Sequence, residues 1–122
     1  MKLTPFGEAA RLQRMRLDLS MKSMAETMQI SSSYLSSIEY GEKRLLQKHI
    51  DSAMNYFKEH KATPDDITNL RRAGEQSKDL VSTSSLAPDA RGLVAAFARR
   101  LQEGDVPSPE MLNWISKRKK GE

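Results

Sequence analysis

Hydrophobic residues recur every three to four positions along most of this chain, which is the spacing of amphipathic α-helices. The alternating runs of Val, Ile and Thr that are typical of β-strands are absent from the sequence. Four dipeptides in which Pro follows a small or helix-capping residue signal the starts of helices. They are Thr4-Pro5, Thr63-Pro64, Ala87-Pro88 and Ser108-Pro109. The pattern therefore predicts an all-α protein.

The periodicity and these start signals predict seven helices, with ends defined to within about 2–4 residues. Their expected ranges are 5–17, 21–28, 32–40, 46–59, 64–80, 88–103 and 109–115. The polar stretch VSTSSL at 81–86 interrupts the periodicity and is the best candidate for a linker. We therefore expect a five-helix domain at residues 1–80 and a C-terminal helical segment at residues 81–122.

The period of 3.6 residues also predicts which positions face inward. On the first helix the inward stripe passes through either Leu12 or Gln13. On the fourth helix it begins at Leu46, and on the fifth it passes through Ala73 or Gly74, with Leu80 as a further candidate.

Residues 19–44 form the most distinctive stretch, predicted as two short helices joined by a tight turn. Ser20 and Ser31 are the expected helix caps, and Gly41 stands where a helix end favours a positive φ. The apolar contact between the two helices is expected from Met24, Ala25, Met28, Ile30, Leu35 and Ile38. The second helix carries serines on its other side, so it combines an apolar anchor with a polar outer face. Such a helix can enter the major groove of DNA.

The same stretch resembles the helix–turn–helix of the Xre/Cro family of phage-repressor-like regulators. Family members resemble the pattern L-S-x-x-x-L-A-x-x-x-G-I-S-x-x-Y-L-S-x-I-E-x-G. This chain has Leu19-Ser20, Met24-Ala25, Ile30-Ser31, Tyr34-Leu35-Ser36, Ile38-Glu39 and Gly41 at those spacings. It departs at Met21, where a glutamine is common, and at Gln29, where the turn has a glycine. The resemblance covers about the first half of the chain and implies a five-helix, repressor-like DNA-binding bundle.

The resemblance also implies roles for individual residues. The residues in base-reading positions are Ser32, Ser33, Ser36 and Ser37. The residues in phosphate-binding positions are Tyr40, Lys43 and Arg44, with Ser20 and Lys22 at the start of the second helix as weaker candidates. Arg14 and Glu39 stand where the family has a buried ion pair. Serine is a less discriminating base reader than arginine or glutamine, so DNA shape and bridging water are expected to add specificity.

The C-terminal helices are expected to mediate dimerisation. One such motif reads only a few base pairs, whereas two recognition helices about 34 Å apart would read half-sites one helical turn apart. The apolar residues expected at the dimer contact are Leu93, Val94, Phe97, Leu101 and Trp114. The basic run Lys117-Arg118-Lys119-Lys120 could either contact DNA or remain a solvated tail.

Charge and composition are compatible with this interpretation. The net charge is +4, and residues 1–62 contain ten Lys and Arg against seven Asp and Glu, whereas residues 63–122 contain ten against nine. A polyanionic partner therefore fits the first half better. There is no cysteine, and His49 and His60 are too far apart in sequence to suggest a metal site. No catalytic motif, signal peptide or membrane-spanning run is visible, so we expect a cytoplasmic protein that is not an enzyme and has no cofactor.

The leading hypothesis is a sequence-specific regulator of transcription, a homodimeric repressor that occupies a palindromic operator. The resemblance further implies autoregulation within a mobile genetic element. The alternative is an antitoxin whose N-terminal half binds DNA while residues 81–122 bind and neutralise a toxin protein. The sequence specifies neither the operator nor an effector.

Overall fold

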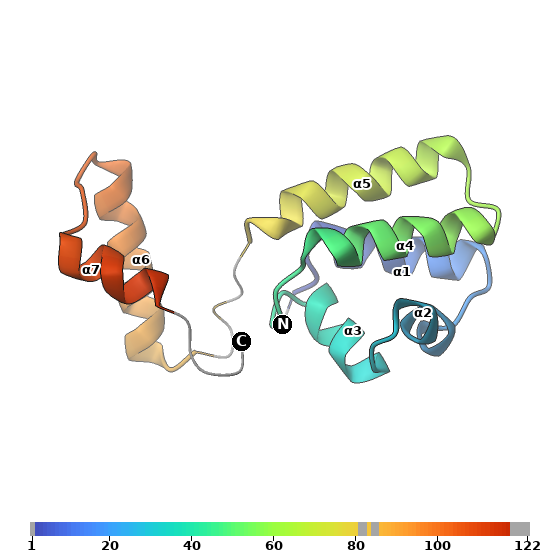
Figure 1. Ribbon diagram of the computed structural model, residues 1–122, viewed down its shortest axis with the longest axis horizontal. Coiled ribbons are helices and arrows are strands. Elements are labelled where there is room, and N and C mark those ends of the chain that lie inside the picture. Colours follow the sequence, from blue (N-terminus) through green and yellow to red (C-terminus); the bar gives the residue numbers. More distant parts are fainter. Residues whose placement is uncertain (1, 81–82, 84–85, 118–122) are drawn as a thin grey trace. The chain divides into compact units, whose positions relative to one another are not determined.

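The computed structural model describes residues 2–80, 83 and 86–117. These residues contain seven α-helices and no strand, which confirms the predicted all-α class (Figure 1). The helices are α1 (Pro5–Arg16), α2 (Met21–Met28), α3 (Ser32–Glu39), α4 (Gln47–Glu59), α5 (Pro64–Lys78), α6 (Pro88–Gln102) and α7 (Pro109–Ser116). The chain forms two compact units, 1–85 and 86–122. Much of the expected linker and three residues of the basic run, 118–120, lie outside the described residues.

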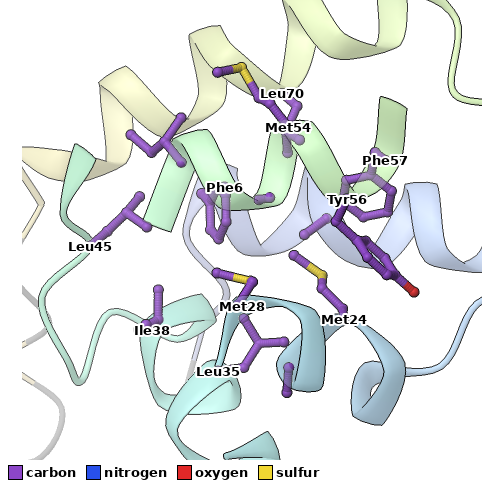
Figure 2. Packing of buried hydrophobic residues seen from close by; sticks show 14 of the residues in the cluster. Phe6, Met24, Met28, Leu35, Ile38, Leu45, Met54, Tyr56, Phe57 and Leu70 are labelled. Carbon is purple, nitrogen blue, oxygen red and sulfur yellow. The ribbon is translucent and has the colours of Figure 1, made fainter. Parts of the chain in front are cut away.

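The first unit is built around one hydrophobic core to which α1 to α5 all contribute. Helix α1 contacts α3 and α5, while α4 contacts α2 and α5, and α2 contacts α3. Figure 2 shows Phe6 among the side chains of α2, α3 and α4, where it is fully buried. Tyr56 and Phe57 of α4 pack edge to face with ring centroids 5.2 Å apart. This core holds α2 and α3 as a pair.

Local hydrogen bonds define the turn between α2 and α3. Gln29 ends α2 in the left-handed conformation, with φ 60° and ψ 39°, as expected for a residue that replaces a turn glycine. The amide of Ile30 bonds to the carbonyl of Ala25 at 3.0 Å, which closes the end of α2. Ser31 then caps α3 by accepting a bond from the amide of Tyr34 at 3.0 Å. Three residues thus reverse the chain between two short helices.

Long-range bonds tie the first turn of α1 to two other helices. The amide and hydroxyl of Thr4 both donate to the carbonyl oxygen of Glu39, at 2.9 and 3.0 Å. The amide of Phe6 donates to the hydroxyl of Ser77 in α5 at 2.8 Å, and that hydroxyl donates to the carbonyl of Ala73. In the first turn of α1, the amide of Phe6 is therefore satisfied by a residue far away in the sequence, while the amide of Gly7 bonds locally to the hydroxyl of Thr4.

Several inward positions differ from the pattern-based expectation. On α1, Gln13 is buried and Leu12 is exposed, because the face that carries Arg14 is turned toward the core. Leu45 is buried in place of the expected Leu46, since Leu46 is the half-buried N-cap of α4. The prediction that Leu80 faces inward is wrong, because its side chain is exposed beyond the end of α5.

Two glycines allow helices of the first unit to approach closely. A Cβ atom on Gly74 of α5 would lie 2.9 Å from two side-chain atoms of Ile50. A Cβ atom on Gly7 of α1 would collide with the backbone carbonyl of Glu39. Backbone cannot move aside as a side chain can, so Gly7 sets the distance between α1 and the end of α3.

Replacing Gly7 with alanine should therefore destabilise the first unit, by about 1–3 kcal/mol as for other overpacked sites. Gly92→Ala is the matched control, because Gly92 is also inside a helix and a Cβ atom there meets nothing within 4 Å. Thermal unfolding followed by circular dichroism should show a lower midpoint for Gly7→Ala only. Equal midpoints for the two variants would contradict the close contact.

Candidate nucleic-acid interface

Helix α3 presents a face of short hydroxyl side chains away from the core. Its inner side is anchored by Leu35 and Ile38, which are buried. The opposite face carries the four expected base-reading residues, of which Ser32 and Ser33 are exposed and Ser36 and Ser37 half-buried. Because these side chains are short, the helix backbone can come close to any surface that this face meets.

The loop after α3 is folded back onto the end of that helix. Gly41 has φ 75°, which reverses the chain as the sequence predicted. The amides of Glu42 and Lys43 both donate to the carbonyl of Ser37, at 2.8 and 3.2 Å. The side chains of Lys43 and Arg44 are exposed. Two exposed cations are thus attached to a backbone that is itself held in place, beside the serine face.

The expected ion pair between Arg14 and Glu39 is present, and both residues are buried. Arg14 donates Nη1 to Oε2 of Glu39 at 2.7 Å and Nη2 to Oε1 at 3.1 Å, so the contact is bidentate. Nη1 also lies 3.1 Å from the sulfur of Met24. The pair joins the last turn of α1 to the last residue of α3 and lies against Met24 of α2.

Arg11 is a partner of Glu39 that the sequence reading missed. Its Nε donates to Oε1 of Glu39 at 3.0 Å, and its guanidinium carbon lies 4.9 Å from the centre of the Tyr40 ring. Its spacing from Arg14 could have predicted this contact, because residues three apart share one face of a helix and both arginines can then reach Glu39. Tyr40, expected to bind phosphate, is half-buried beneath this guanidinium.

The start of α2 provides fewer groups that could bind an anion than the loop after α3 does. The hydroxyl of Ser20 accepts a bond from the amide of Ser23 at 3.0 Å, so its position is set by capping. Lys22 is exposed. Met21, where the resembling family has glutamine, packs against the core. Ser23 in turn accepts a bond from the Tyr56 hydroxyl at 2.8 Å, which connects α2 to α4.

Among the titratable residues that the structure describes, two have pKa values shifted from their ordinary range. Burial lowers the pKa of His49, and the nearby charge of Lys48 adds to this effect. His49 is therefore mainly neutral at pH 7, and its Nδ1 can accept the bond from the amide of Leu46 at 3.0 Å. The pKa of Asp66 is also lowered, mainly by a hydrogen bond with Thr63. Asp66 is in α5 and is not part of the serine face of α3.

The described part of the second unit is a hairpin of α6 and α7, and neither helix contains a buried residue. Its two helices line a groove of about 560 Å³ whose walls are mostly apolar. Four of the five expected dimerisation residues line this groove, namely Leu93, Val94, Phe97 and Trp114. Leu101 lines an adjoining hollow near the turn between the helices. Trp114 is 77% exposed, so the hairpin leaves its largest apolar side chain uncovered within its own unit.

Other kinds of site have no support in the part of the chain that the structure describes. No group of three or more His, Cys, Asp or Glu residues there could hold a metal ion. None of its helices combines the length and the apolar character needed to cross a membrane. Comparisons with protein-family models, curated proteins and solved structures found no match. Any function must therefore be inferred from the chain's own residues.

Replacing Glu39 with glutamine should destabilise the first unit by about 3–5 kcal/mol, because it leaves two arginines next to a buried site without their anion. Glu42→Gln removes a carboxylate from an exposed position three residues away and should change stability by less than about 0.5 kcal/mol. Chemical denaturation of the two variants measures both values. A Glu39→Gln variant as stable as the Glu42→Gln variant would contradict the structural role of the ion pair.

Proposed function

We propose that this protein is a sequence-specific DNA-binding regulator of transcription that acts as a homodimer. In this proposal α2 and α3 are a helix–turn–helix, and α3 enters the major groove with its serine face toward the base edges. The major groove is about 12 Å wide and admits one α-helix. The observation that carries the proposal is an outward-facing row of serines on a rigidly held helix, followed at the C-terminal end of that helix by a loop with two exposed cations, Lys43 and Arg44.

The bonds around α3 support a role in reading a surface. A helix that is held in place before it binds loses less entropy on binding and so keeps more affinity. The first turn of α3 is capped by Ser31, and its last residue is held by Thr4, Arg11 and Arg14. The serines on its outer face are short, so they add little ordering cost of their own, and Tyr34 is the large exposed side chain of this helix.

The second unit supports dimerisation. Helical segments shorter than about 40 residues seldom bury enough apolar surface to be stable alone. The large apolar side chains of the hairpin that are exposed include Leu93, Val94, Leu101, Met111, Leu112, Trp114 and Ile115. Apolar patches of this kind on a monomer mark interaction sites. We infer that a second hairpin covers this face, forming a four-helix bundle.

Two observations favour a second copy as the partner of the hairpin. Among its described residues, the first unit exposes few large apolar side chains, namely Leu12, Met15, Tyr34 and Leu80, so they offer little apolar surface to cover the groove. The helices of the hairpin carry balanced charges, because residues 86–117 contain four Lys and Arg and four Asp and Glu, and the rest of the basic run follows them. The apolar faces of two copies would therefore meet without repulsion between the helices that carry them, and a twofold axis would match each face with its own equivalent.

The two kinds of contact on α3 and its loop should be separable by mutation. Ser33→Ala/Ser37→Ala should lower the preference for the selected sequence, by about 1 kcal/mol for each hydrogen bond to a base that is removed. Lys43→Ala/Arg44→Ala should weaken binding to every duplex and reduce the slope of log K against log salt by about 0.9 for each phosphate that is no longer neutralised. Selection from a random duplex pool, followed by salt titrations with the selected duplex and a scrambled one, measures both effects.

Each double variant is the control for the other. The serine variant should keep the salt slope, and the Lys43/Arg44 variant should keep the ratio of specific to nonspecific affinity. An unchanged sequence preference in the serine variant would refute the base-reading face. Absence of binding by the folded wild-type chain to any duplex would refute the proposed function.

Trp114→Glu should convert the dimer to a monomer and lower affinity for a two-half-site duplex, because it places a charge in the apolar groove. Asn113→Glu adds the same charge to the same helix at a position that does not line the groove, and it should remain dimeric. Sedimentation velocity distinguishes these states. A monomeric wild-type chain would contradict the dimer and would favour the antitoxin hypothesis, in which a toxin protein occupies the groove.

A further inference from the structure

We propose that Arg11 is an additional DNA-contacting residue that binds a backbone phosphate from α1, with Tyr40 and Glu39 holding its guanidinium in place. This inference rests on the proposed DNA-binding function and adds a contact that the sequence motif does not contain. It follows from the charges around one buried carboxylate, from the exposure of one arginine and from its position beside the loop after α3.

The charges around Glu39 do not cancel. One fully buried carboxylate faces two guanidinium groups, those of Arg14 and Arg11. Arg14 already satisfies both carboxylate oxygens with a bidentate contact, and only 7% of its side chain is exposed. Arg11 is therefore not needed to neutralise Glu39, and the cluster has one positive charge in excess. An excess charge of this kind favours an anionic partner at the surface.

The excess charge is accessible to solvent. The side chain of Arg11 is 35% exposed, five times the fraction of Arg14. Arg11 binds Glu39 through Nε, and its Nη groups make no hydrogen bond to any of the described residues. These groups retain several N–H donors in a planar arrangement that suits two oxygens of one phosphate. The geometry thus leaves the phosphate-binding part of the guanidinium unused.

The guanidinium is also held before any ligand arrives. Nε is fixed by the bond to Glu39, and the group lies over the Tyr40 ring at 4.9 Å, a cation–π distance. Lys43 and Arg44, in contrast, are exposed side chains that must be ordered on binding. A cation that is ordered in advance binds at a smaller entropic cost. Arg11 should therefore contribute more affinity than its partial burial suggests.

The position of Arg11 fits the path of a DNA backbone in the proposed complex. Tyr40 directly follows the last residue of α3 and precedes the loop that carries Lys43 and Arg44. A guanidinium over this ring lies at the same end of α3 as those two cations. Phosphates flank a helix inserted in the major groove, so this end of α3 is where backbone contacts are expected.

Arg11→Gln tests the contact, and Arg16→Gln is its matched control. Arg16 is an exposed arginine on the same helix, but its described ion-pair partner is Asp66 of α5. In salt titrations with a scrambled duplex, Arg11→Gln should reduce the slope of log K against log salt by about 0.9 for each protomer bound. Arg16→Gln should keep the wild-type slope. Arg11→Lys, which retains the charge but not the planar fork, should keep the slope and bind several-fold more weakly.

The outcomes separate this proposal from the proposed function. If Lys43→Ala/Arg44→Ala reduces the slope but folded Arg11→Gln does not, Arg11 has a structural role only and the proposal is overturned. If the folded wild-type chain binds no duplex, the DNA-binding function itself fails. Should Arg11→Gln not fold, Tyr40→Leu removes the ring while leaving the bond to Glu39. Both Tyr40→Leu and Tyr40→Phe lack the hydroxyl, and only Tyr40→Phe keeps the ring, so several-fold weaker duplex binding by Tyr40→Leu than by Tyr40→Phe supports the proposal, and equal affinities of these two variants overturn it.

Discussion

Burying a carboxylate away from water is costly unless cations bind it, and in this protein Arg14 and Arg11 both bind the buried Glu39. The contact determines the rotation of α1, because Arg14 must face the end of α3. That rotation buries Gln13 and exposes Leu12. Gly7, on the same face of α1, then lets the two backbones meet. The placement of α3, and with it the serine face, follows from one buried charge.

Features that depend on local physics could be predicted from the sequence. The helix ends follow from caps and prolines, and the left-handed Gln29 and the positive φ of Gly41 follow from their positions in the turn pattern. Features that depend on distant partners could not be derived this way. The burial of Gln13 requires knowing where Glu39 lies, and the bond from Phe6 to Ser77 joins residues 71 positions apart. The pairing of Arg11 with Glu39 can be identified only when the relative position of α1 and α3 is known.

The candidate interface combines a helix that is held in a fixed position with an outer face of low chemical selectivity. The frame of α3 is specified by several independent bonds, whereas its outer face consists of hydroxyl groups that can both donate and accept. In the proposed complex such a face accepts many base edges, so selectivity depends on groove width, on water and on the spacing of two copies. The apolar hairpin would then contribute to specificity without touching DNA, since it sets the distance between the two α3 helices.

The bond between Phe6 and Ser77 has a consequence for how the chain folds during synthesis. Helix α1 completes its first turn with a hydroxyl from α5, which is synthesised later, so α1 cannot reach its final state until α5 has emerged. Until then, the face of α1 that packs on α5 is open to other contacts. The bond therefore makes completion of the first unit depend on residues near its C-terminal end, and the apolar hairpin follows them in the chain.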